Sequence, residues 1–314
     1  MTDGRDDGEF AMVGEVRTGL LMNRLALPSD QVAELLDLVP GERVRARERP
    51  VPWAVSADQL HGVDCPLITR SGARPRAIGT LAARVRVVGG RVVQGSTRSV
   101  VAPGGDRRQR WSHYMARPGV VELGGRGDPA DAAARFLTGR APESLDPGAV
   151  SEALLRRIRA SRLLDRRSPF RPRRTRLRWS AVVGGERLRG AFTLVDAELR
   201  TVRLRVPEAA GVTREQLTAL CEDLALHDWL LTTVARVVER RASDADPAAQ
   251  DDLLAVVGQL LHLWLPSADV PPRLGGMWEG IEVNPGFTRQ WELCVNRLRD
   301  ELTLRALRGG TVPQ

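Results

Sequence analysis

In residues 174–183 apolar side chains alternate with arginines and small polar residues, the period of two expected of a strand with one buried face. Residues 188–194 and 202–206 repeat this alternation, and the intervening Gly184-Gly185 and Asp196 are typical of turns. The pattern predicts an antiparallel meander with one apolar face on the core and a row of arginines on the other face.

The front of the chain also has the pattern of strands. Residues 81–87 and 91–101 alternate around Gly89-Gly90, which predicts a hairpin. Further strands are expected at 14–21 and 120–123. Short helices are expected after Pro28 and from Pro129 to Leu137, where Asp128 is the predicted cap. Long crossover helices between strands are absent from the pattern, so a parallel, doubly wound sheet is not expected.

The last third of the chain has helical periodicity. From Thr213 to Arg240 neither glycine nor proline occurs, and buried-type residues recur every three or four positions. This seam contains Leu217, Cys221, Leu224, Asp228, Leu231, Ala235 and Val238. Two more helices are expected at 248–265 and 287–308. We therefore predict an α+β protein with an antiparallel β-rich N-terminal half that includes a meander, followed by a C-terminal α-helical bundle.

Four segments are expected along the chain. Residues 1–11 are acidic and polar and are expected to form a disordered tail. Residues 12–146 form the predicted β-rich lobe, 147–210 an arginine-rich helix with the meander, and 211–314 the helical bundle.

Composition narrows the classes of function. The chain contains no lysine, so all 47 basic residues are arginine, and a P-loop lysine, a kinase-type lysine and a Schiff-base lysine are excluded. The three cysteines are far apart and are expected to be reduced thiols. Neither a secretory leader nor an apolar run long enough to span a membrane is visible, which predicts a cytoplasmic protein without membrane insertion. No cofactor or metal is predicted.

Positive charge is concentrated in one segment. Residues 156–178 contain 11 arginines and a single acid, Asp165, for a net charge of +10 against +8 for the whole chain. Such a concentration favours a surface for an acidic protein partner or a phosphorylated ligand, because guanidinium groups bind phosphate and carboxylate bidentately. The predicted ligand-binding residues are Arg166, Arg167, Arg174, Arg176, Arg178, Arg203 and Arg205. The alternative is a solvated sheet face in a protein that uses no lysine.

Two other classes of function stay open. Nucleic-acid binding is disfavoured, because only 4% of residues are aromatic, and Trp179 and Phe192 fall on the apolar face of the meander, so its basic face has no stacking platform. The Trp111–Met115 segment follows three arginines and is compatible with a planar or anionic ligand, or with aromatic side chains that pack inward.

An enzyme acting on an anionic substrate is the other alternative. His61 and Cys65 are expected in one loop and contain the groups of a nucleophile and its base. His113, His227 and Asp228 are further catalytic candidates, with Asp223 four residues before His227 to orient its ring. The competing interpretation is structural: a turn at Asp64, and polar groups that specify helix packing.

Six strings span most of the chain after Met12: GEVRTGLL at 14–21, GVDCPL at 62–67, WSHYMARPGV at 111–120, SRLLDRRSPFR at 161–171, LCEDLALHDWLLTT at 220–233 and FTRQW at 287–291. With these strings the chain resembles an uncharacterised actinobacterial family of about 300 residues. The resemblance implies a gene neighbourhood shared with a variant P-loop protein and a methyltransferase-like protein. It implies no activity, cofactor or catalytic residue.

Overall fold

The computed structural model describes residues 10–125, 127–138, 144–168, 170, 172–184, 186–243, 258–266, 268 and 270–309. Within them the α+β class is confirmed, as ten strands form one mixed sheet. The strands are β1 (Phe10–Leu20), β2 (Arg45–Arg47), β3 (Trp53–Val55), β4 (Gln59–Pro66), β5 (Arg76–Val88), β6 (Val92–Pro103), β7 (Val120–Leu123), β8 (Thr175–Val183), β9 (Arg189–Leu194) and β10 (Leu199–Val206). The helices are α1 (Ser29–Leu36), α2 (Trp111–Met115), α3 (Pro129–Phe136), α4 (Pro147–Arg159), α5 (Arg214–Ser243), α7 (Gly275–Val283) and α8 (Phe287–Gly309).

Strand β1 joins the front and back of the chain in this sheet. It pairs antiparallel with β6 on one side and with β8 on the other, so residues from both halves form one continuous surface. The predicted disordered tail of residues 1–11 is too long at its end, because Phe10 and Ala11 belong to β1 and pair with neighbouring strands. Residues 1–9 lie outside the described part. The hairpin around Gly89-Gly90 is confirmed as β5 and β6.

The predicted meander order is wrong. Strand β10 lies between β8 and β9 and runs parallel to β8, while β9 pairs only with β10 along the sheet path. Burial explains this order, since Val202, Leu204 and Val206 of β10 are all fully buried or nearly so, whereas β9 is largely exposed. The strand with the more apolar face takes the inner position.

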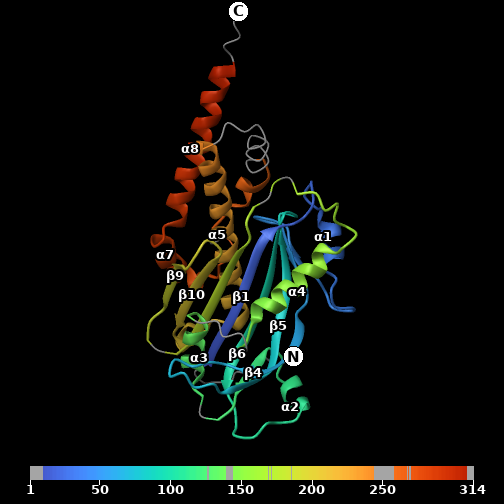
Figure 1. Cartoon of the computed structure of the whole chain (residues 1–314), viewed down its shortest axis with the longest axis vertical. Helices are drawn as coiled ribbons and strands as arrows, with labels where there is room; N and C mark the ends of the chain where they lie inside the picture. The colour runs from blue at the N-terminus through green and yellow to red at the C-terminus, as the bar shows by residue number, and fades with distance from the viewer. Residues whose placement is uncertain are drawn as a thin grey trace, which may run out of the picture.

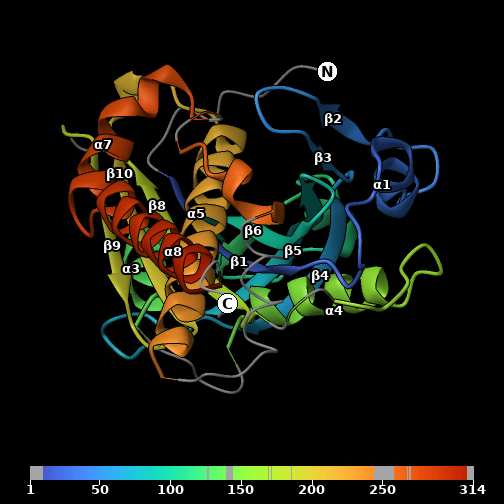
Figure 2. The same ribbon diagram turned by 90° about the horizontal axis from the view of Figure 1, so that it is seen from above.

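Helices cover both faces of the sheet (Figures 1 and 2). Helix α5 packs on β1, β6 and β8, with α7 against β9 and α8 against α5. Helices α1, α3 and α4 pack on the opposite face. The C-terminal helices therefore share their core with the sheet, as Trp179 of β8 and Trp229 of α5 lie fully buried in one cluster.

The helical seam of α5 is confirmed, since Leu217, Cys221 and Leu224 are fully buried. Most of the predicted helix at 248–265 lies outside the described residues, and Leu261–Leu263 forms a single 3₁₀ turn. Among the described helices, none has the length and apolar character required to cross a membrane.

Candidate functional site

Three of the seven predicted arginines line one hollow. Arg176 and Arg178 of β8 and Arg203 of β10 lie on the sheet face that also carries α3, around a space of about 650 Å³. Thr138, just beyond the end of α3, borders the same space. The remaining lining residues are Leu137, Ala191, Thr193, Val195, Asp196, Leu199 and Thr201. We call this space the arginine hollow.

Strand register brings these side chains together. Arg178 is opposite Thr201 of β10, and Thr201 is opposite Thr193 of β9, so the three form a row across the sheet. Arg203 lies two positions along β10 from Thr201, on the same face. Adjacent strands are about 4.8 Å apart, so the guanidinium groups of Arg178 and Arg203 can reach one ligand.

The other four predicted arginines do not line the hollow. Arg205 is exposed at the next position on this face of β10. Arg174 pairs with Glu152 of α4 at 3.2 Å between Nη1 and Oε1. Arg166 and Arg167 lie in the loop before β8, where Asp165 accepts a hydrogen bond from the backbone N–H of Arg167.

Glu15 of β1 holds the arginines at the inner edge of the hollow. Its carboxylate is fully buried and accepts hydrogen bonds from the Nε atoms of Arg17, Arg176 and Arg178 at 3.0–3.1 Å. Burial alone would raise the pKa of Glu15, but the guanidinium groups, with Arg176 first, lower it below its usual value of 4.5. Glu15 therefore stays ionised and fixes the orientation of Arg176 and Arg178.

Arg203 differs from these two arginines. Within the described residues, its Nε atom is buried and has no hydrogen-bond partner. A buried donor without a partner is costly, since its interaction with water is lost and nothing replaces it. Within the described residues Arg203 therefore lacks the carboxylate partner that Glu15 provides to Arg176 and Arg178, although it lines the same hollow.

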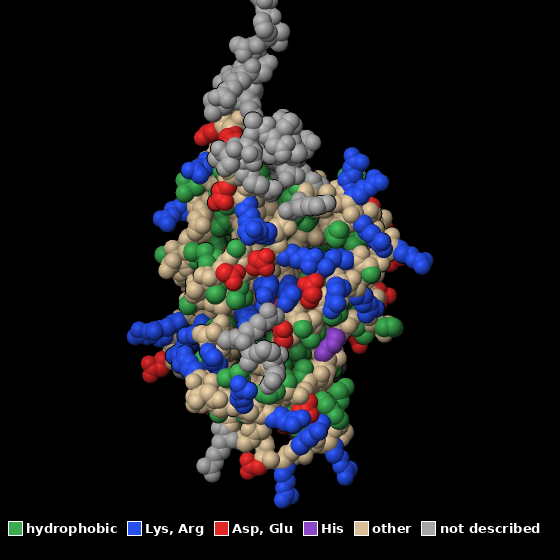
Figure 3. All heavy atoms as spheres, viewed as in Figure 1, with side chains coloured by type: hydrophobic (Ala, Val, Ile, Leu, Met, Phe, Trp, Pro, Cys, Tyr) green, Lys and Arg blue, Asp and Glu red, His purple; other side chains and the backbone are tan. Residues whose placement is uncertain are grey.

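The charged surface continues from the hollow onto α4. Glu152 accepts hydrogen bonds from Arg17 and Arg159 and also pairs with Arg174. Figure 3 shows arginine side chains with acidic side chains among them across the middle of this face. Part of the predicted arginine surface is thus neutralised by Glu15 and Glu152.

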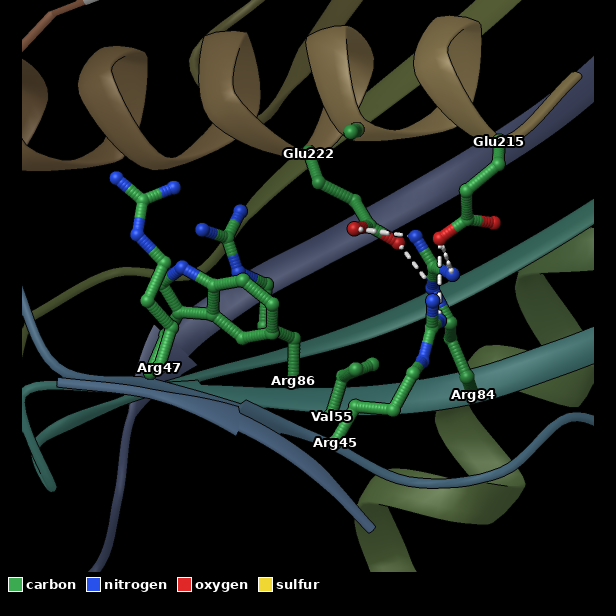
Figure 4. Close-up of a pocket in the computed structure, with 9 residues that line it drawn as sticks. Arg45, Arg47, Val55, Arg84, Arg86, Glu215 and Glu222 are labelled. Carbon is green, nitrogen blue, oxygen red and sulfur yellow. Dashed lines mark hydrogen bonds and ion pairs between the residues drawn. The ribbon is translucent and has the colours of Figure 1, made fainter. Parts of the chain in front are cut away.

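A second, smaller space of about 110 Å³ lies on the opposite face, between β2, β3, β5 and α5. Figure 4 shows its arginines extending from the strands towards Glu215 and Glu222 of α5. Arg84 is almost fully buried and pairs bidentately with Glu222, at 2.8 Å for each N–O contact, and with Glu215 at 2.6 Å. The lining residues are Arg45, Arg47, Trp53, Val55, Arg84, Arg86, Glu215, Ala219 and Glu222.

Arginines of this second space form ion pairs with its two carboxylates. Burial would raise the pKa of Glu215, but Arg84, Arg98 and Arg45 lower it to about 2. Arg84 and Arg86 likewise lower the pKa of the buried Glu222. The network attaches α5 to the sheet, and we assign it a structural role.

The catalytic candidates His61 and Cys65 lie in strand β4 rather than in a loop. Four residues along a strand span about 13 Å, so the imidazole and the thiol cannot form a nucleophile–base pair. Burial lowers the pKa of His61 and raises the pKa of Cys65, which makes the thiolate less available. Asp64 faces the other side of the sheet and pairs with Arg76 and Arg108.

The remaining candidates have separate partners. His113 contacts Glu122 of β7 at 2.7 Å between Nε2 and Oε1. His227 contacts the backbone oxygen of Asp223 at 2.8 Å and packs edge-to-face against Trp264 and Trp278. Asp228 accepts a hydrogen bond of 2.6 Å from Arg200. None of these groups lines the arginine hollow.

Asp228 has a testable pH dependence. Burial raises its pKa to about 6 despite the opposing effect of Arg200, whereas the unfolded chain titrates near 3.8. The folded protein therefore holds a proton that the unfolded chain releases between about pH 4 and 6, so this group lowers stability as pH rises through that window.

The Asp228→Asn variant lacks this titrating group and serves as the reference. Between pH 3.5 and pH 7 we expect the wild type to lose up to about 3 kcal/mol of unfolding free energy relative to this variant. Denaturant unfolding of both proteins at each pH measures this difference. A difference that is constant across the range would contradict the raised pKa.

Sequence reasoning did not find Glu15, Arg84 or Glu222. The available signal was a charged residue at a position where the flanking pattern is apolar, as for Glu15 between Val13 and Val16. Such a residue must be paired if the segment is a central strand.

Comparisons with known proteins found no match for this chain, whether among family models, curated proteins or solved structures. The geometry of the hollow is therefore the basis for a functional proposal.

Proposed function

We propose that this protein binds a small anionic ligand, most simply a phosphorylated one, in the arginine hollow. The observation that carries the proposal is that Arg176, Arg178 and Arg203 line one hollow, and that within the described residues Arg203 lacks the carboxylate partner that the other two have. Guanidinium groups match the geometry of phosphate oxygens, and each contact to a charged acceptor is stronger than a neutral one.

The size of the hollow supports a small molecule rather than an acidic protein surface. A volume of about 650 Å³ lies within the range of ligand pockets, about 300–1,000 Å³. Leu137, Ala191 and Leu199 offer apolar contact, while the hydroxyls of Thr193 and Thr201 are available to polar groups of the ligand. These surroundings suit a phosphate or carboxylate attached to a compact organic body.

Binding is favoured over catalysis at this site. Asp196 is the carboxylic acid among the residues that line the hollow, and the backbone N–H groups of Glu198 and Leu199 donate to it and lower its pKa. An exposed carboxylate with a lowered pKa is a poor general acid or base near neutral pH. The hollow thus offers groups that hold a charge rather than transfer a proton.

Replacing Arg203 with Gln tests the proposal. We expect pyrophosphate and citrate, used as probes, to bind the wild type, and the Arg203→Gln variant to bind them about tenfold to hundredfold more weakly, because a charge-assisted contact is lost. Isothermal titration calorimetry at low salt measures both affinities.

Arg205→Gln is the matched control. Arg205 lies two residues after Arg203 on β10, and its exposed side chain does not line the hollow, so the substitution removes the same charge outside the proposed site. We expect this variant to bind the probes with nearly wild-type affinity. Equal losses in the two variants would indicate general electrostatic attraction, and would contradict a defined site at Arg203.

A further inference from the structure

Strand β4, helix α2 and the loop before α2 form a second surface at one end of the sheet. Trp111 is 43% exposed there, although large apolar side chains are usually buried. Met115 of α2 and Leu60 of β4 are also exposed. Arg76, Arg107, Arg108 and Arg110 are exposed in the same region, and Figure 3 shows arginines projecting from this end of the molecule. We call Trp111 and these four arginines the Trp111 surface.

Asp64 forms ion pairs with both β5 and the loop before α2. Its carboxylate contacts Nε of Arg76 at 2.5 Å and Nη2 of Arg108 at 3.0 Å. The hydrogen bond from Arg76, followed by the charges of Arg76 and Arg108, lowers the pKa of Asp64. An ionised Asp64 therefore holds arginines from β5 and from the loop before α2 beside one another.

The indole of Trp111 has a firm support. It packs edge-to-face on the ring of Tyr114, with centroids 5.7 Å apart, and Tyr114 is buried. The hydroxyl of Tyr114 accepts a hydrogen bond from the backbone N–H of Gln109 at 3.0 Å, which fixes the loop to α2. The indole also lies next to β4, since a Cβ at Gly62 would be in van der Waals contact with its Cη2 and Cζ3 at 3.5 Å. The exposed part of the ring is therefore a preorganised flat surface.

Positive charge surrounds this flat surface. The guanidinium of Arg108 lies over the indole, with its Cζ 5.9 Å from the ring centroid, so a stacked base would lie beside this charge or replace it on the ring. Arg107 and Arg110 form no ion pair with the part of the chain that the structure describes. These arginines are free to contact anionic groups next to a molecule stacked on Trp111.

We propose that the Trp111 surface binds single-stranded nucleic acid, with a base stacked on Trp111 and the backbone phosphates on Arg107, Arg108 and Arg110. An exposed aromatic ring within a positively charged surface is the arrangement by which proteins hold unpaired nucleotides. An acidic protein segment would use the arginines but would leave the exposed ring without a matching partner. The scarcity of aromatic residues argued against the meander as a nucleic-acid site, whereas here the ring and the charge lie together.

Fluorescence anisotropy with a labelled single strand of about 15 nucleotides, as DNA and as RNA, tests this proposal. We expect binding whose affinity falls steeply between about 50 and 200 mM salt. Trp111→Ala should weaken binding about tenfold, while Trp111→Phe should retain most of the affinity because it keeps an aromatic face. The double variant Arg107→Gln/Arg110→Gln should reduce the slope of affinity against salt by about 1–2.

Arg156→Gln/Arg157→Gln is the matched control, since it removes two exposed arginines from α4, outside the Trp111 surface. We expect it to leave affinity and salt slope nearly unchanged. Failure of the wild type to bind either strand at 50 mM salt would overturn the proposal. Equal effects of the two double variants would also overturn it. The same holds if polyaspartate competes fully and Trp111→Ala has no effect, because either result indicates attraction by charge alone.

Discussion

Replacing Glu222 with Gln is expected to lower the free energy of unfolding by about 3–5 kcal/mol, as for other broken buried ion pairs. Glu222 and Arg84 are each 2% exposed and form a bidentate pair between α5 and β5. The substitution keeps the volume but removes the fully buried, bidentate partner of Arg84, which then keeps only its contact with the partly exposed Glu215. Guanidinium chloride unfolding followed by circular dichroism measures the loss.

Glu215→Gln is the internal control for this prediction. Glu215 also contacts Arg84, but its side chain is 44% exposed, so water replaces much of the lost interaction. We expect this variant to lose less than about 1 kcal/mol. The double replacement Arg84→Met/Glu222→Leu should recover most of the loss caused by Glu222→Gln, since it removes both buried charges. A double variant as unstable as the single one would show that packing, rather than the unpaired charge, sets the cost.

Replacing Glu15 with Gln is expected to have the second large effect, a loss of about 3 kcal/mol, because three arginines lose a buried counter-charge together. Arg176 and Arg178 line the arginine hollow, so this variant should also bind pyrophosphate more weakly than the wild type. Denaturant unfolding measures the first effect and calorimetry the second. Glu152→Gln is the control, since its partly exposed carboxylate contacts Arg17 without lining the hollow.

The effect of Glu15 depends on pH with a defined sign. Its pKa in the folded protein is lower than its usual value of 4.5, so its contribution to stability is complete above that value. The contribution is lost as pH falls through the lower, folded-state pKa. The stability difference between the wild type and Glu15→Gln should therefore be constant near neutral pH and narrow below about pH 4. A difference that widens in acid would contradict this assignment.

Local patterns predicted much of the secondary structure. The hairpin at Gly89-Gly90 follows from a turn in which both glycines have positive φ values, 57° and 61°, a backbone that other residues rarely adopt. A side chain at position 90 would also meet the backbone oxygen of Leu27. The seam of α5 and the cap at Asp128 are likewise local, because both depend on neighbours within one or two helical turns.

Strand order and the partners of charged residues needed the tertiary structure. Sequence placed 174–183, 188–194 and 202–206 as neighbours in chain order, but β10 entered between the other two because its buried face is more apolar. Alternation placed Arg176, Arg178 and Arg203 on one face, and this holds in the parallel pairing too, since side chains alternate irrespective of strand direction.

The sequence by itself determined most of the strands, the α5 seam and the arginine faces, because these depend on periods of 2 and 3.6 residues along the chain. It did not predict β2, β3 or β4, which are short or lack a clear alternation. Only the tertiary structure decided which arginines are neutralised. Glu15 lies 161 residues before Arg176, and Glu222 lies 138 residues after Arg84. No local period connects groups so far apart. Pairing with a buried carboxylate in a low-dielectric interior distinguishes the structural arginines from Arg203, whose Nε lacks a partner in the described structure.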